Sequence, residues 1–79
     1  MQADELKKLI EEGIPGARAE IRGDGDHFEG VVVAAAFAGK KMLEQHRMVY
    51  DVLGDLMHNE IHAFSMRTFT PEEWEQAAS

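Results

Sequence analysis

Histidines are the residues of this 79-residue chain whose type and spacing could support metal chemistry, since the chain contains four of them and no cysteine. His62 stands at the start of an apolar run typical of a strand, and His27 lies in an upstream glycine-rich loop. Neutral imidazole is a common metal ligand, and two imidazoles make half of a metal site. A half site implies a partner that supplies the other ligands. Each histidine also has a structural alternative. His62 could cap or hydrogen-bond a neighbouring turn, and His27 could be an ordinary polar residue of a turn.

Other side chains that bind metals in proteins fit structural roles better. His46 lies on or beside the apolar stripe of a predicted helix, which indicates packing, and His58 lies in a loop, which indicates contact with solvent. Asp24, Asp26 and Glu29 have a weak calcium-like spacing, but the twelve-residue loop with its terminal bidentate glutamate is missing. We expect the methionines at helix and strand spacing to fill gaps in the core, namely Met42, Met48, Met57 and Met66.

The sequence contains no constellation of residues that indicates an enzyme. It lacks a nucleophile beside a base, paired carboxylates in a plausible cleft and a phosphate-binding glycine loop. The G-x-x-G at Gly13–Gly16 falls between a helix and a strand and contains a proline, so a turn explains it better than a nucleic-acid loop does. We therefore expect a binding protein.

Net charge opposes nucleic acid as the main ligand. The formal net charge is −7, whereas affinity for a phosphate backbone comes largely from Lys and Arg that displace counterions. Lys40, Lys41 and Arg47 form a basic cluster at the start of a predicted helix. This cluster is the candidate nucleic-acid-binding site, and a protein docking surface or a solvated helix face are its alternatives.

Hydrophobic spacing predicts the N-terminal elements that must position these residues. Apolar residues at helical spacing predict a helix over residues 4–12, with Gly13 as its left-handed C-cap. Alternation over residues 17–22 predicts a short strand with one wet face. The apolar run 28–37 predicts a longer, more buried strand that forms a hairpin with the first.

The C-terminal half predicts a crossover between parallel strands. Apolar residues at threes and fours predict a helix over 42–57, with Gln45 among its polar positions. The helix leads to a strand from Ile61, which should lie parallel to and beside the second strand. Thr70, followed by Pro and two Glu residues, predicts the start of a last helix that Trp74 anchors to the sheet.

These elements predict an α+β fold, a two-layer sandwich in the order helix-strand-strand-helix-strand-helix. Helices should cover one face of a three-stranded mixed sheet, and residues 1–79 should form one domain. The chain shows neither a signal-peptide pattern nor an apolar run of membrane-spanning length, and it has no cysteine. A cytoplasmic location, with no membrane among the partners, is the expectation.

Four segments of the chain resemble the BolA family, and more closely its IbaG-like, acid-stress branch. They are Gly25-Asp26-His27-Phe28; Phe37-Ala38-Gly39-Lys40; His46-Arg47-Met48-Val49-Tyr50 with Leu53-Gly54; and Ile61-His62-Ala63 with Thr68-Phe69-Thr70-Pro71-Glu72-Glu73-Trp74. The resemblance covers nearly the whole chain. It implies a class II KH-like fold and a partnership with monothiol glutaredoxins around a shared two-iron two-sulfur cluster.

The resemblance also implies which residues bind the cluster. The family contributes a ligand from the loop between the first two strands and a histidine at the start of the third, which correspond here to His27 and His62. Imidazole can replace thiolate on one iron of such a cluster, as in Rieske centres. A glutaredoxin cysteine and a bound glutathione would supply the remaining thiolates, so we expect no cluster in the protein alone. The implied function is iron–sulfur cluster trafficking or regulation of the response to iron and stress.

Two further functions remain open at the level of sequence. The first is a KH-like transcriptional regulator that binds DNA or RNA through the basic cluster, because KH-like folds bind single strands. The second is a zinc or copper carrier that uses the same two histidines, because imidazole suits those metals too. A homodimer is also left open.

Overall fold

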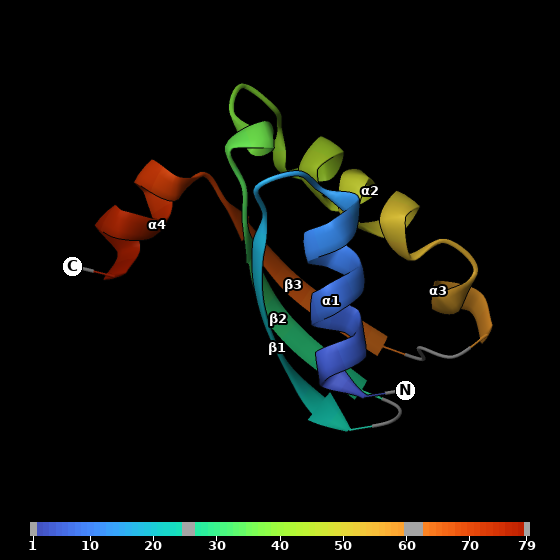
Figure 1. The fold of residues 1–79 in the computed structure, drawn as a ribbon. Coiled ribbons are helices and arrows are strands. Elements are labelled where there is room, and N and C mark those ends of the chain that lie inside the picture. The colour runs from blue at the N-terminus through green and yellow to red at the C-terminus, as the bar shows by residue number, and fades with distance from the viewer. Residues whose placement is uncertain (1, 25–26, 60–62, 79) are drawn as a thin grey trace.

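The structure is a computed structural model that describes residues 2–24, 27–59 and 63–78. The elements confirm the predicted α+β order, with a 3₁₀ turn and a short helix added (Figure 1). The helices are α1 (Ala3–Gly13), α2 (Met42–Leu53), α3 (Leu56–Asn59) and α4 (Pro71–Ala78), and the 3₁₀ turn η1 is Ala35–Phe37. The strands are β1 (Arg18–Asp24), β2 (His27–Val33) and β3 (Ala63–Phe69).

The three strands form one mixed sheet in the order β1-β2-β3. β1 and β2 pair antiparallel, and β2 and β3 pair parallel, which confirms both the hairpin and the crossover. The register sets His27 opposite Asp24 on β1 and opposite Ala63 on β3. The end of the sheet at which β2 and β3 begin is therefore where His27 lies.

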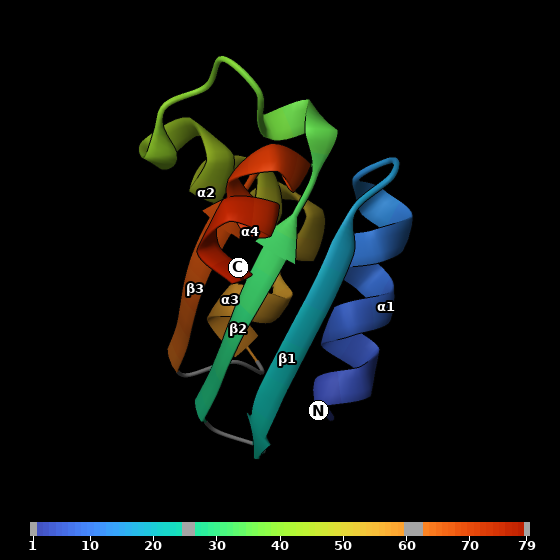
Figure 2. The same cartoon turned by 90° about the vertical axis from the view of Figure 1, so that its left-hand side faces the viewer.

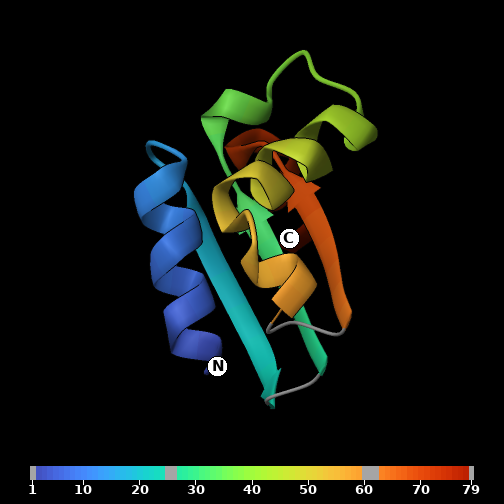
Figure 3. The ribbon, with the colours of Figure 1, turned by 90° about the vertical axis from the view of Figure 1, so that its right-hand side faces the viewer.

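Helices α1, α2 and α3 pack on one face of the sheet (Figure 3). The core between them and the sheet is built from aliphatic and aromatic side chains, of which the largest fully buried ones are Leu6, Ile10, Val32, Phe37 and Val49. Burying such side chains is the main force that holds a small domain together.

Helix α4 lies on the opposite side of the sheet from α1 and α2, so the prediction that all helices cover one face is wrong (Figure 1). Phe64 and Met66 of β3 point into the core, and alternation along the strand puts Phe69 on the other face. The ring of Trp74 lies 5.2 Å from that of Phe69, centroid to centroid. Trp74 thus anchors α4 to the sheet, as predicted, but on the face that Phe69 presents.

The start of α4 confirms the predicted cap. The backbone N–H of Glu73 donates to Thr70 Oγ1 (3.2 Å), and the N–H of Thr70 donates to Glu73 Oε1 (2.8 Å). This reciprocal pair satisfies two backbone donors at the helix start. Pro71 occupies the first helical position, where no N–H is needed.

The apolar run 28–37 is not one strand, contrary to prediction. β2 ends at Val33, which pairs with both Arg18 and Phe69 at the ends of the neighbouring strands. Beyond Val33, the N–H of Ala34 still bonds to the carbonyl of Phe69, the last residue of β3, and the backbone then turns into η1. Phe37 then fills the core from the turn with none of its surface exposed.

The predicted helix over 42–57 is divided in two at Gly54. This residue has a φ of +54°, and its N–H donates to the carbonyl of Tyr50 (2.8 Å), which closes α2. Glycine adopts such a conformation without the steric cost that other residues meet. α3 follows as a separate short turn of helix.

Two positions of α2 differ from the predicted stripe. Met42 is 68% exposed rather than buried, whereas Gln45 is buried. Gln45 occupies the inward position because its amide satisfies polar groups there: Nε2 donates to the carbonyls of Phe37 (3.1 Å) and Lys40 (2.9 Å), and Oε1 accepts from the Thr68 hydroxyl (2.6 Å). The three other methionines, Met48, Met57 and Met66, pack in or against the core as predicted.

Gly13 is the last residue of α1 and does not form a left-handed cap, contrary to prediction. Positive φ occurs instead at Gly16, in the turn that follows. A Cβ at Gly13 would lie 2.8 Å from Cγ2 of Val52 in α2. Glycine at this position therefore allows α1 and α2 to approach closely.

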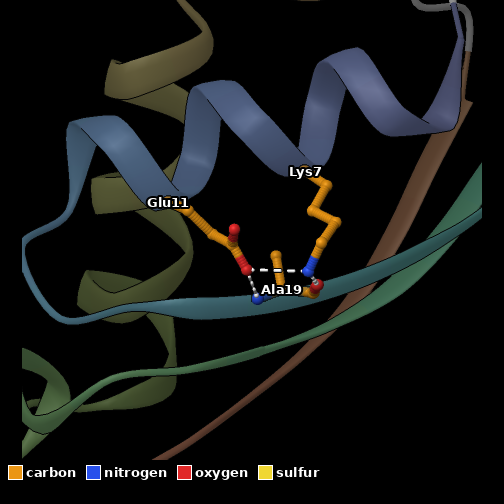
Figure 4. A network of polar contacts seen from close by, with 3 residues as sticks. All are labelled: Lys7, Glu11 and Ala19. Carbon is orange, nitrogen blue, oxygen red and sulfur yellow. Dashed lines mark hydrogen bonds and ion pairs between the residues drawn. The ribbon is translucent and has the colours of Figure 1, made fainter.

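An ion pair of α1 holds the outer edge of β1 (Figure 4). Lys7 Nζ lies 2.9 Å from Glu11 Oε2 and donates to the carbonyl of Ala19 (2.8 Å). The N–H of Ala19 donates to the same Glu11 oxygen (2.9 Å). Hydrogen bonds from Lys7 and then from the Ala19 backbone lower the pKa of Glu11, because both stabilise its charged form.

Loss of this contact on acidification is a testable consequence. A carboxyl whose pKa is lower in the folded state stabilises the fold above its unfolded pKa, and this stability is lost as the pH falls through the folded value. We expect Glu11→Gln to lower the free energy of unfolding at neutral pH by about 1 kcal/mol, as for a partly exposed charged hydrogen bond. The deficit should shrink as the wild type is acidified, which urea unfolding at several pH values would measure.

Glu12→Gln is the matched control for this prediction. The Lys8–Glu12 pair spans 4.0 Å, and its side chains are 77% and 64% exposed. Such surface pairs contribute little to stability. Equal losses in the two variants would show that the contact with Ala19 has no special role.

Candidate functional site

His27 stands at the first position of β2 with its side chain exposed. Because Phe28 is buried in the core, alternation places His27 on the other face of the sheet. A hollow of about 440 Å³ opens there, lined by Arg22, Gly23, His27, Phe28, Glu29, Ala63 and Ser65. The imidazole is thus accessible to a ligand or a partner that approaches this end of the sheet.

His62, the second predicted ligand, lies outside the described residues, as does Asp26. Ala63, to which His62 is covalently joined, is the register partner of His27. No three His, Cys, Asp or Glu residues gather to hold a metal ion in the part of the chain that the structure describes. Glu29, from the weak calcium-like set, instead forms an ion pair with Arg22, whose Nε lies 2.8 Å from Glu29 Oε1.

His46 is half-buried on α2, which agrees with the predicted packing role. Its Nε2 atom is buried and has no hydrogen-bond partner among the described residues. His58 lies in α3 and not in the predicted loop, and its side chain is outside what the structure describes.

The basic cluster of Lys40, Lys41 and Arg47 is exposed at the start of α2. Met42 and Leu43 lie within it, 68% and 69% exposed. Sequence reasoning missed this apolar pair. Leu43 lies outside the apolar stripe predicted for this helix, beside the basic cluster. A large apolar residue off the stripe is the signal by which the pair could have been found.

The face of the sheet away from α1 and α2 carries three of the four arginines of the chain, Arg18, Arg22 and Arg67. A second hollow of about 400 Å³ lies on this face, with Glu20, Val31 and Ser65 among its lining residues. The guanidinium of Arg67 lies over the ring of Phe69, 5.3 Å from its centroid. This surface joins the one that presents His27.

The fold is that of a BolA-like domain. The family model of BolA-like proteins matches residues 9–73. The chain belongs to the BolA family, which confirms the resemblance seen in the sequence.

The named relatives of the chain include a transcriptional regulator and a stress protein. It is 42% identical over 55 residues to the DNA-binding transcriptional regulator BolA of Vibrio cholerae, a match covering 70% of this chain and 52% of that protein. It is 29% identical over 75 residues to the acid stress protein IbaG of Escherichia coli, covering 94% and 89%. The chain thus spans about half the length of the BolA regulators that it matches.

A solved structure shows the same family likeness. The BolA protein homologue from Coxiella burnetii superposes with a TM-score of 0.87 and 42% sequence identity, covering 95% of this chain and 97% of that one. None of the helices in the described ranges is both long and apolar enough to cross a lipid bilayer.

Proposed function

We propose that this protein shares a two-iron two-sulfur cluster with a monothiol glutaredoxin, to which it contributes His27 and His62. The observation that carries the proposal is the parallel register of β2 and β3, in which His27 pairs with Ala63. Ala63 directly follows His62 in the sequence. The register thus pairs the start of β2 with the start of β3, although the two strands lie far apart in the sequence.

The chemistry of the donor set fits this role. His27 is exposed, and imidazole ligands on one iron raise the reduction potential of such a cluster. The chain has no cysteine, so the thiolates must come from elsewhere. A glutaredoxin cysteine and a bound glutathione would supply them, and the protein would then act in cluster trafficking or in the response to iron and stress.

The proposal is tested by mixing the protein with cluster-loaded monothiol glutaredoxin and recording the visible absorption and circular dichroism. We expect the wild type to shift the cluster bands, because imidazole replaces a thiolate ligand. His27→Ala and His62→Ala should each weaken the shift, and the double variant should abolish it.

His58→Ala is the matched control, since it removes an imidazole from α3 and leaves both candidate ligands in place. An unchanged shift in the His27, His62 double variant would refute the ligand assignment. Far-UV circular dichroism of each variant shows whether the fold is retained.

A nucleic-acid-binding regulator is the second candidate function. Exposure of Lys40, Lys41 and Arg47 favours it, as does the name of the Vibrio cholerae relative. A complex driven by phosphate contacts is recognised by a steep loss of affinity with salt, about one unit of log–log slope per contact. The net charge of −7 weighs against it and ranks it second.

A further inference from the structure

The two outer edges of the sheet differ in how their backbone groups are satisfied. On β1, both the N–H and the carbonyl of Ala19 are bonded to side chains of α1, those of Glu11 and Lys7 (Figure 4). This contact occupies backbone groups that could otherwise pair with another strand. The β1 edge is therefore protected near its start, at the second residue of the strand.

The outer edge of β3 has no such protection. The carbonyl of Phe69 accepts from the N–H of Ala34 (3.0 Å), on the side of β2. Backbone groups alternate sides along a strand, so those of Phe64, Met66 and Thr68 point away from β2. No hydrogen bond between described residues uses these groups. Figures 2 and 3 show β3 as the outermost strand from opposite sides.

The composition of β3 does little to discourage pairing, since Arg67 is the one charged residue in the strand. Its seven residues contain no Pro, Gly or Lys, and their register with β2 runs without a bulge. Proteins that must keep an edge unpaired use such residues and bulges to block it. A regular edge of this length can accept an extended segment as an added strand.

Positive charge and apolar side chains surround the C-terminal end of this edge. Gln45 bonds to both the carbonyl of Lys40 and the hydroxyl of Thr68, so the segment before α2 lies beside the end of β3. That segment contains Lys40 and Lys41, whose positive charge is partly offset by Glu44. The exposed Met42 and Leu43 follow it. Arg67 adds a third cation on the open face.

We infer that the outer edge of β3 docks an extended acidic segment of a partner protein as a fourth strand. Backbone hydrogen bonds to Phe64, Met66 and Thr68 supply the affinity. Acidic side chains on one face of the segment meet Arg67, and the positive charge of the lysines before α2 adds to the attraction at this end, while apolar side chains on its other face cover Met42 and Leu43. This inference is independent of cluster binding, since it uses neither histidine.

The test uses a short, fluorescently labelled peptide of alternating valine and glutamate, and a matched peptide with lysine in place of glutamate. Anisotropy should show that the wild type prefers the glutamate peptide. Amide hydrogen exchange by NMR should show new protection at Phe64, Met66 and Thr68. The amides of Ser65 and Arg67, which already face β2, should be protected with and without peptide.

A charge exchange sharpens the test. Arg67→Glu should lower the affinity for the glutamate peptide about tenfold, because an opposite-charge cross-strand pair becomes a like-charge pair. The variant should bind the lysine peptide more tightly instead. Arg18→Glu is the matched control: it reverses an exposed arginine on the same sheet face but on β1, and should leave the peptide preference unchanged.

Several outcomes would overturn the inference. One is peptide binding without protection at the three edge amides. Another is binding of a single-stranded oligonucleotide at this edge while neither peptide binds, which would assign the edge to nucleic acid. A third is protection that depends on protein concentration without peptide, which would assign it to a second copy of the chain.

Discussion

A Gly23→Ala variant is expected to lose at least about 2 kcal/mol of folding stability and the regular start of β2. Gly23 has a φ of +134°, a conformation that residues with a side chain rarely adopt. An added Cβ would also clash with the carbonyl oxygen of His27 and lie 2.8 Å from Cα of Phe28. Both obstacles are backbone atoms of the paired strand, so the hairpin must open to relieve them.

This prediction joins stability to the candidate site, because the displaced residue is His27. Urea unfolding gives the free energy, and backbone NMR shifts of residues 27–33 report the start of β2. Gly16→Ala is the control: Gly16 also has a positive φ (+76°), but a Cβ added there would meet nothing within 4 Å. It should cost only about 1 kcal/mol of backbone strain. Equal costs at the two glycines would refute the steric argument.

Phe37→Ala is expected to lower the free energy of unfolding by about 3–5 kcal/mol, which is a large part of the stability of a small domain. The Phe37 side chain is completely buried where η1 closes the core. Removing the ring takes away its transfer free energy and leaves a cavity that the neighbouring strands and helices only partly fill. Thermal and chemical unfolding should both show a much lower midpoint.

Leu43→Ala is the matched control for Phe37, since it also truncates a large apolar side chain near α2. Leu43 is 69% exposed, so its truncation should change stability by less than about 0.5 kcal/mol. Comparable losses would mean that the exposed pair of Met42 and Leu43 packs against something in solution.

Patterns that act over a few residues were predictable from the sequence. Thr70 and Glu73 form their reciprocal cap because both partners lie within one helical turn. The hairpin and the parallel crossover followed from strand spacing and the length of the connection. The family resemblance rested on short segments of this kind and is confirmed. The ligand roles of His27 and His62 stay predictions, and His62 lies outside the described residues.

Features that depend on distant partners were not predictable. β2 stops at Val33 because both neighbouring strands end there, although the apolar run continues to Phe37. Gln45 is buried because three polar groups from η1, the following loop and β3 meet it. The side of the sheet on which α4 lies follows from the contact between Phe69 and Trp74.

Residue order alone was enough to specify the family, most of the element types and which histidines are candidate ligands, because periodicity and short motifs are local properties. The folded chain was needed to set His27 beside Ala63, to protect the β1 edge with Lys7 and Glu11, and to leave the β3 edge open. These features arise from register and from which elements end up as neighbours. Both are settled by contacts between residues far apart in the chain, where no local pattern carries the information.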